Sequence, residues 1–480
     1  MRSLVWFRAD LRIRDNPALS EACRNSDEGV MAVFCACPAQ WRAHGWAAIK
    51  VDLLLRHLTD LSQSLNDLNI PLLLRRPPRF ADVAHLLLDL AECHRCDALW
   101  FNREYEVNEC HRDAQVTDRF VDAGKAVHAW EDQSVIAPAT LHTTNDTFYS
   151  VFTPFRKKWI ATVKGKNGPR VRRAPRAQPP LDIAADPIPT ALPAFRGLTR
   201  PDLWKAGEAH ALSRLRAFVQ KRAVDYEVRR DLPAANGTSV LSPYLALGAV
   251  SARQCLKAAM DANDGRLDSG LAGLTTWITE LIWREFYRHV LVGFPQICMH
   301  KAFDRRMRTI PWRNDKSGFA RWCQGTTGIP IVDAGMRQLL QTGWMHNRLR
   351  MITAMFLTKN LFIDWRRGER FFMQHLVDGD FANNNGGWQW SASVGPNASP
   401  YFRIFNPISQ SQRFDPEGHF IRKFVPELAQ LPADAVHLPA KDESATDYPA
   451  PIVDLKASRQ RAIDQFKKYL SSYPASVNPG

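Results

Sequence analysis

The feature that most constrains the fold is a change of periodicity part-way along the chain. Short apolar runs, typical of buried strands, alternate with helical patterns in the first part and disappear after about Glu208. The runs lie at residues 3–7, 31–36, 71–74, 98–101 and 126–130. Over residues 51–68, apolar positions recur every three or four residues, as one buried helix face requires. This part therefore predicts an α/β domain with a mostly parallel, doubly wound sheet.

The later part predicts a different class of domain. A chain of 480 residues exceeds one ordinary core, and amphipathic segments such as 211–222 and 331–340 indicate an all-α domain whose last helix covers residues 455–469. Residues 156–201 are rich in proline and basic side chains, which indicates a linker. We predict an α/β domain over residues 1–135, an interdomain linker over 136–205 and a helical domain over 206–475.

Charge and cysteine usage restrict the partners and the compartment. The formal charge of +14 favours a polyanionic partner such as DNA, RNA or an anionic membrane, although a basic protein without such a partner fits the charge equally well. The sequence contains no run of about 18 apolar residues, which argues against a membrane span. The start of the chain lacks the apolar stretch of a secretory signal. The nine scattered cysteines fit reduced thiols, and the single pair Cys93 and Cys96 gives little support to a zinc site. We expect a cytoplasmic protein.

One segment has the composition of a phosphate-binding turn. Gly237, Thr238 and Ser239 supply a flexible backbone and hydroxyls, and Ser242 precedes an apolar helical run. Ordinary helix capping explains most such clusters, so the segment alone decides nothing. No G-x-G-x-x-G follows the first strand, so we expect the main cofactor outside the α/β domain.

Aromatic and polar residues gather in three later segments. Trp277, Glu280 and Trp283 are spaced three apart and would share one helix face, where they either line a cavity for a flat ligand or pack in the core. Residues 344–351 combine amides and arginines that suit phosphate contacts. Residues 378–390 are so rich in Gly, Asn and Asp beside two tryptophans that we predict a loop gripping a heterocycle. A metal site at His375, Asp378 and Asp380 has no matching spacing.

These segments together resemble the photolyase and cryptochrome family, in the same order and over nearly the whole chain. The resemblance is strongest to the bacterial class I cyclobutane pyrimidine dimer photolyases. It is carried by residues 5–8, 10–12, 237–239, 283–287, 344–350 and 378–390. It implies an α/β antenna domain, a long linker and a helical domain that buries FAD, and it implies light-driven electron transfer from reduced FAD to a pyrimidine dimer in DNA.

The resemblance also implies which residues contact FAD. Asn384 is similar to the residue that faces flavin N5, where an uncharged amide helps keep the reduced flavin usable as an electron donor. The implied FAD contacts are Tyr226, Thr238, Ser239, Val240, Leu241, Ser242, Trp277, Arg284, Asn347, Arg350, Asp378, Asp380 and Asn384.

The same resemblance implies a lesion pocket, phosphate contacts and an electron path. The pocket for the flipped dimer would be lined by Glu280, Trp283, Asn347, Met351 and Trp390, with Glu280 donating or sharing a proton. Flanking phosphates would be held by Arg230, Arg348 and Arg403. Trp388, Trp365 and Trp312 match a tryptophan chain that passes electrons from the surface to the flavin, although core packing would also explain each of them.

A second chromophore is implied in the first domain. His44, Asn108 and Glu109 match residues that hold a methenyltetrahydrofolate antenna in similar bacterial proteins. The chain departs from that pattern at Met299, where a lysine is expected, with Lys301 two residues later. The folate is therefore less strongly implied than FAD.

Four other functions remain open. A cryptochrome photoreceptor is disfavoured by the intact pair Asn347 and Met351 and by the short segment after Tyr469. Repair of (6-4) photoproducts is disfavoured because Asn347 stands where a second histidine is expected beside His346. A photolyase that prefers single-stranded DNA and a basic helical DNA-binding protein without a chromophore are separated by experiment. We expect a monomer with no protein partner.

Overall fold

The computed structural model describes residues 1–166, 168–439 and 447–471. Contacts divide the chain into two compact units, and each is described by itself. The first contains Met1–Val224, Ser239–Pro295 and Val377–Gly379, and the second contains Asp225–Thr238, Gln296–Leu376 and the described part of Asp380–Gly480.

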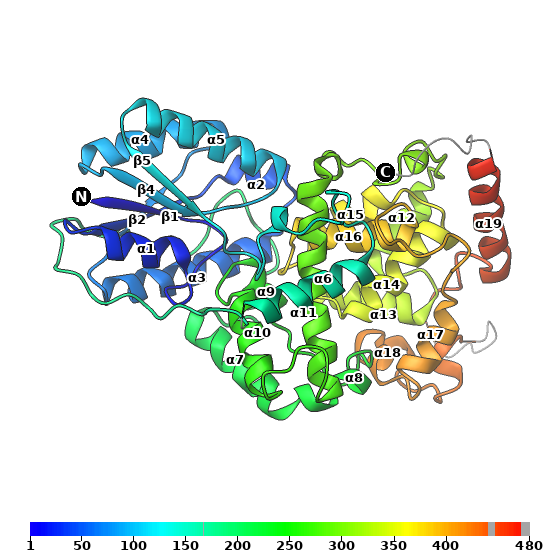
Figure 1. The fold of residues 1–480 in the computed structure, drawn as a ribbon. Helices are drawn as coiled ribbons and strands as arrows, with labels where there is room; N and C mark the ends of the chain where they lie inside the picture. The colour runs from blue at the N-terminus through cyan, green and yellow to red at the C-terminus, as the bar shows by residue number, and fades with distance from the viewer. Residues whose placement is uncertain (167, 440–446, 472–480) are drawn as a thin grey trace. The chain divides into compact units, whose positions relative to one another are not determined.

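A five-stranded parallel sheet organises the start of the first unit (Figure 1). The strand order is β3-β2-β1-β4-β5, and Ser3 of the central strand pairs with Val30 on one side and Ala98 on the other. The strands are β1 (Ser3–Phe7), β2 (Val30–Cys35), β3 (Leu72–Arg75), β4 (Ala98–Asn102) and β5 (Ala126–Trp130). The predicted parallel sheet is confirmed. The prediction that all five strands are buried is wrong for the edge strand β5, which is half-exposed, whereas the opposite edge strand β3 is mostly buried.

Helices cover both faces of this sheet, as a doubly wound fold requires. Figure 1 shows α1 (Pro17–Asn25) and α3 (Ala48–Asn66) below the strands, and α4 (Val83–Cys93) and α5 (Val107–Asp122) above them. A short helix, α2 (Pro38–Ala43), follows β2. Helix α3 buries the leucines of the 51–68 pattern as far as Leu65 against the domain core, and Leu68 lies beyond its end.

The stretch predicted as a linker begins as a helix. Helix α6 (Phe152–Gly165) includes the first residues of the 156–201 segment and buries Phe155, Trp159 and Val163. The indole N–H of Trp159 donates to buried Glu285 at 2.6 Å. The predicted linker therefore contains a packed helix at its start, because an apolar stripe recurs among the basic residues there.

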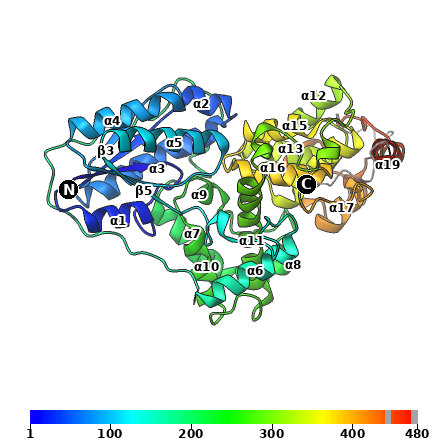
Figure 2. The same cartoon turned by 45° about the horizontal axis from the view of Figure 1, so that its top comes forward.

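Four further helices complete the first unit (Figure 2). They are α7 (Glu208–Lys221), α9 (Ser242–Ala246), α10 (Ala252–Asp261) and α11 (Ala272–Gly293). Helix α11 is the longest of them and packs against α6 and α10. It carries Trp277, Glu280, Trp283 and Arg284, which the sequence predicts on one helix.

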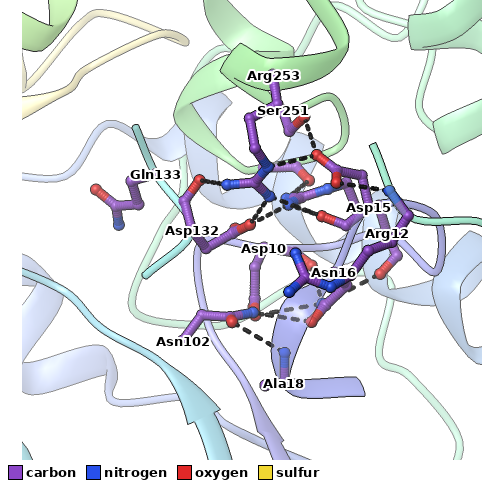
Figure 3. Close-up of polar contacts among 12 residues, drawn as sticks. Asp10, Arg12, Asp15, Asn16, Ala18, Asn102, Asp132, Gln133, Ser251 and Arg253 are labelled. Atoms are coloured by element: carbon purple, nitrogen blue, oxygen red, sulfur yellow. Dashed lines mark hydrogen bonds and ion pairs between the residues drawn. The ribbon is translucent and has the colours of Figure 1, made fainter. Parts of the chain in front are cut away.

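A buried ionic network connects α10 to the α/β part of the same unit (Figure 3). Arg253 donates from Nη2 to Asp132 Oδ1 at 2.6 Å and from Nε to Asp15 Oδ2 at 2.9 Å. Arg12 also pairs with Asp132, and the hydroxyl of Ser251 donates to Asp15. Burial opposes ionisation, but Arg12 and Arg253 hold the pKa of Asp132 below its ordinary value.

The described residues of the second unit contain helices and no strand, which confirms the all-α prediction. A π-helical turn at residues 356–360 follows α14, and a large apolar core includes Trp322, Trp365 and Trp388. The helices are α8 (Tyr226–Arg229), α12 (Lys316–Gln324), α13 (Pro330–Thr342), α14 (Asn347–Met355), α15 (Trp365–Met373), α16 (Phe381–Ala392), α17 (Pro407–Phe414), α18 (His419–Phe424) and α19 (Leu455–Ser471).

The prediction of a loop over residues 378–390 is wrong. Most of this segment forms α16, which begins when the side chain of Asp380 accepts a hydrogen bond from the backbone N–H of Asn383. Helix α16 packs closely on α15. The approach is so close that a Cβ placed on Gly368 would lie 2.1 Å from Cη2 of Trp388. This packing outweighs the low helix propensity of Gly386 and Gly387.

No described helix is long and apolar enough to span a bilayer. The searched residues also contain no cluster of three or more His, Cys, Asp or Glu side chains arranged to hold a metal ion.

Candidate functional site

The predicted phosphate segment has a strained backbone. Val240 has φ +49°, a left-handed conformation that is unusual for a β-branched residue. Arg214 donates from Nε to the carbonyl of the preceding Ser239 at 3.1 Å, and Leu241 is buried. In the second unit, Gly237 leaves no room for a side chain, because a Cβ would lie 2.5 Å from the carbonyl oxygen of Arg229. Strain of this kind is often found at binding sites.

Helix α11 holds its predicted site residues through contacts within the first unit. Trp283 stacks on Phe152 with ring centroids 3.6 Å apart and planes 5° apart, so its indole is fixed as a flat platform. Arg284 donates from Nη1 to the carbonyl of Gln133 at 2.7 Å. Trp277 is 3% exposed and packs edge-on against Phe218, while Glu280 is half-buried.

Helix α14 begins at the predicted lesion-pocket residue Asn347, which is exposed. The ring of His346 caps the helix by accepting from the N–H of Arg348, and burial lowers the pKa of His346 to about 4. The histidine is therefore neutral near pH 7, and its buried Nε2 has no hydrogen-bond partner among the described residues. Arg350 donates from Nε to the carbonyl of Met345 at 2.8 Å, and Met351 is half-buried.

The three arginines predicted to contact phosphates differ in the ion pairs that they form within the protein. Arg348 is already bound, because its Nη2 donates to Asp231 Oδ2 at 2.7 Å and its guanidinium lies 4.4 Å from the ring of Phe414. Nε of Arg230 lies 3.9 Å from Oδ1 of the same Asp231 carboxylate. Cζ of Arg230 lies 5.7 Å from the ring centroid of Tyr226. Arg403 is exposed and forms no ion pair with a described residue.

Asn384 occupies a polar position inside α16. Its Nδ2 donates to the backbone carbonyl of Glu369 at 3.0 Å and lies 3.3 Å from Glu369 Oε1. Both residues are buried. Trp390 is half-buried on the same helix. In the first unit, buried Asp378 is next to Gly379, whose carbonyl accepts from Nζ of Lys50 at 2.6 Å.

The three tryptophans of the predicted electron path differ in burial. Trp388 and Trp365 are 2% and 0% exposed in one apolar core, and Trp312 packs half-buried at its edge against Phe362. The indole N–H groups of Trp365 and Trp312 are buried without a hydrogen-bond acceptor among the described residues. Indoles without acceptors cannot readily lose a proton, which favours passing on charge over trapping it.

The three predicted antenna residues lie together in the first unit. Nδ2 of Asn108 is 2.9 Å from Nε2 of His44, and Oε1 of Glu109 is 3.4 Å from Nδ1 of the same ring. Two of them begin α5, and His44 ends α2. His44 and Asn108 are therefore in contact although they are 64 residues apart in the sequence.

Glu109 also lines a pocket that sequence reasoning missed. The pocket encloses about 540 Å³ including its open mouth, and aromatic, cationic and acidic side chains line it. Buried Nε and Nη2 of Arg8 and Oε2 of Glu109 have no hydrogen-bond partner among the described residues. Its lining includes Trp6, Arg8, Trp41, Trp46, Lys50, Glu109 and Arg112. Trp46 and Lys50 carry no motif in the sequence, and the stacking of Trp41 on Trp46 comes from tertiary packing.

Both halves of the chain match models of known families. Residues 3–179 match the model described as DNA photolyase, and residues 277–468 match the model described as FAD binding domain of DNA photolyase. The deoxyribodipyrimidine photo-lyase of Salmonella typhimurium is 42% identical over 468 residues, which cover 97% of this chain and 98% of the relative. That of Vibrio cholerae is also 42% identical, over 97% of this chain and 99% of its own length. The chain belongs to the DNA photolyase family.

Solved structures extend the similarity to the complete fold of these proteins. A class III photolyase from Agrobacterium tumefaciens has a TM-score of 0.88 at 34% identity, with 98% of each chain covered. A photolyase from Sulfolobus tokodaii described with two FAD molecules has a TM-score of 0.80 at 30% identity, covering 98% of this chain and all of that one. A Synechocystis cryptochrome has a TM-score of 0.85 at 28% identity, covering 97% and 99%. The fold resemblance and the FAD-binding domain are therefore confirmed.

Proposed function

We propose that this protein is a deoxyribodipyrimidine photo-lyase that uses light to split cyclobutane pyrimidine dimers in DNA. The supporting observation is the family match, because the matched segment 277–468 contains the predicted lesion contacts Glu280, Trp283, Asn347, Met351 and Trp390. We also propose the functional division into an antenna domain over 1–135, a linker over 136–205 and a catalytic domain over 206–475, of which residues 472–475 lie outside the described residues.

The donor set fits FAD. Oδ1 of Asn384 accepts no hydrogen bond from a described residue, so it is available to a ligand. The left-handed backbone at Val240 is a conformation found in turns whose N–H groups bind phosphate. Arg284, Arg350, Asp378 and Asp380 supply charges for the polar parts of the cofactor. When bound, FAD supplies the light absorption and the electron that opens the dimer.

The chain's residues would bind and polarise the dimer without forming a covalent bond to it. The platform made by Trp283 on Phe152 offers an aromatic plane to an unstacked base, and bases bind such planes with about 1–3 kcal/mol each. Glu280 and exposed Asn347 supply hydrogen-bonding groups for the base edges. Glu280 would share a proton with a carbonyl of the dimer as negative charge develops there.

The basic charge fits a DNA substrate. Arg403, Arg230 and Arg348 would contact phosphates on either side of the flipped dimer. Arg403 is free of ion pairs with described residues, whereas Arg348 would share its guanidinium between Asp231 and the DNA. We propose a cytoplasmic monomer.

We propose an antenna chromophore in the first unit, with methenyltetrahydrofolate as the first candidate. His44, Asn108 and Glu109 form one contiguous polar cluster that suits its ring system. The methionine at position 299 weakens this assignment, because a lysine would pair with the acidic tail of a folate. Absorption and mass spectrometry of the chromophore released from purified protein identify it.

A cryptochrome photoreceptor is the second candidate, and the similarity to the Synechocystis protein favours it. Substrate choice separates the candidates. We expect reduced holoprotein to remove cyclobutane dimers from duplex DNA in blue light and to leave (6-4) photoproducts intact. Repair confined to single-stranded or looped-out dimers would indicate the single-strand-preferring relatives, and bound FAD with no repair of any lesion would favour the photoreceptor.

A further inference from the structure

The orientation of the Asn384 side-chain amide is determined by its surroundings. The backbone carbonyl of Glu369 can only accept a hydrogen bond, so the Asn384 atom 3.0 Å from it must be the NH₂ group. The same NH₂ lies 3.3 Å from Oε1 of the Glu369 side chain. Oδ1 of Asn384 therefore points away from Glu369, and it accepts no hydrogen bond from a described residue.

Glu369 is an unusual residue for its place in α15. It is 2% exposed and lies one turn after Trp365, on a helix that packs against α16 and the π-helical turn. No ion pair satisfies its carboxylate among the described residues. Burying a carboxyl group in this way costs stability, and such groups often have a functional role.

The charges around Glu369 are few. Arg370 acts on it from the same helix, but burial dominates and raises the pKa of Glu369 to about 7. Two charged residues on the packed elements have other partners. Asp380 at the start of α16 accepts from Asn383, and Lys359 of the π-helical turn donates to Ser393 and to the carbonyl of Ala392. The protonation of Glu369 can therefore change close to neutral pH.

We propose that Glu369 is a positioning residue that fixes the amide of Asn384 with its oxygen toward flavin N5, and that its charge tunes the reduction potential of the bound flavin. This inference rests on the proposed FAD site, in which Asn384 faces N5. Two-electron reduction with uptake of one proton places a hydrogen on N5, and a fixed Oδ1 accepts that N–H. The oxidised flavin has only a lone pair at N5, which the same oxygen repels.

The sign of the electrostatic effect follows from the charge of Glu369. Below about pH 7 the carboxyl is neutral, and the oriented amide favours the reduced flavin. Above that pH the carboxylate adds negative charge near the flavin, which disfavours adding electrons. The reduction potential should therefore fall with pH through this range by more than flavin protonation alone requires.

The test is spectroelectrochemical titration of the flavin in holoprotein between about pH 5.5 and 8.5, a range centred on the ionisation of the carboxyl. E369Q keeps an acceptor for the Asn384 amide without a charge, so it should lose the extra fall and keep the wild-type potential of low pH. E369L removes the side-chain acceptor and leaves the NH₂ of Asn384 only the backbone carbonyl at position 369. This looser amide should reduce the ratio of reduced to oxidised flavin at low pH about tenfold, which is about 30 mV for a two-electron couple. E427Q removes a carboxylate that pairs with Arg337 elsewhere in the second unit and should behave as wild type.

Identical titrations of wild type, E369Q and E369L would overturn the inference. A wild-type protein that binds no flavin would instead reject the proposed function. If the variants do not fold, wild-type holoprotein still provides a test by infrared difference spectroscopy between oxidised and reduced flavin. A protonated-carboxyl band that is present at pH 6 and weak at pH 8 is expected, and its absence at both would contradict the inference.

Discussion

Two buried tryptophans of the second unit differ at the indole N–H. Trp322 donates from Nε1 to the carbonyl of Thr353 at 3.1 Å, whereas Trp365 has no acceptor among the described residues. Both are fully buried in the same core. A structural tryptophan gains from such a hydrogen bond, but an indole that carries charge briefly is better left without an acceptor. Trp6 and Trp130 of the first unit also lack an acceptor within the described part of the chain, so the proposed role of Trp365 in electron transfer needs its own test.

W365F should abolish photoreduction of the flavin by an external donor, because a phenyl ring is much harder to oxidise than an indole. W322F is the matched control and should keep photoreduction. W322F should nevertheless be the less stable variant by about 0.5–1.5 kcal/mol, since it loses an indole hydrogen bond that Trp365 does not form with any described residue. Transient absorption and chemical denaturation measure the two effects, and equal loss of photoreduction in both variants would contradict the assignment.

At the residue scale, sequence patterns identify only part of the candidate site. Asn384 and the tryptophan path were predicted from the resemblance, while Glu369 was missed. Glu369 stands in the run Arg366, Arg367, Gly368, Glu369, Arg370, which reads as a solvated helix face with surface ion pairs. Only the packing of α15 on α16 buries its carboxyl, so no local pattern could have identified it.

At the scale of elements, the crossing of α15 and α16 depends on one glycine. Gly368 lies against the ring of Trp388 and a methyl group of Leu357, whereas a Cβ on Gly387 would have no neighbour within 4 Å. The same crossing explains why the loop prediction for residues 378–390 failed. Helix propensity argues against two adjacent glycines, but tertiary packing and the Asp380 cap supply the missing stability.

G368A should destabilise the protein by about 1–3 kcal/mol, because the new methyl group overpacks the crossing and displaces Trp388. G387A should be neutral or stabilising by up to about 1 kcal/mol, since alanine favours the helix and meets nothing. Urea denaturation of both variants decides the point. A stable G368A would mean that the two helices do not approach as closely as described.

The ionic network of Figure 3 predicts a pH effect. The pKa of Asp132 is lowered in the folded state, so its contribution is present above the unfolded pKa of about 4 and disappears as pH falls through the folded value. D132N should lose about 3–5 kcal/mol near neutral pH, because it leaves buried Arg12 without its carboxylate partner and Arg253 with only that of Asp15. Its stability should then fall less on acidification than that of wild type, as denaturation at several pH values would measure. Parallel pH profiles would contradict this reasoning.

At the scale of the whole molecule, charge determines how DNA binding responds to salt. The chain carries a formal charge of +14, but many arginines are engaged within the protein, and Arg348 is one of them. The fold class could be predicted from periodicity, since the strand runs and helix stripes extend over whole elements. The partial exposure of β5 and the helix at residues 152–165 could not, because tertiary packing determines how far each segment is covered.

R403A should weaken binding to dimer-containing duplex and reduce the slope of log K against log salt by about 0.9, the value for one lost phosphate contact. K257A is the matched control, because Lys257 is an exposed cation paired with Asp261 and is not a predicted DNA contact. Fluorescence anisotropy at several salt concentrations measures both slopes. Equal slopes for R403A and K257A would remove Arg403 from the interface.

The most direct test of the central claim is light-dependent loss of a thymine dimer from duplex DNA. Wild-type holoprotein is reduced chemically under anaerobic conditions, so that the tryptophan path is not needed, and it is mixed with the substrate in matched dark and blue-light samples. The account predicts that intact pyrimidines are restored in the light and that the dimer is unchanged in the dark. Flavin-loaded protein that binds the substrate but leaves the dimer intact in the light would contradict it.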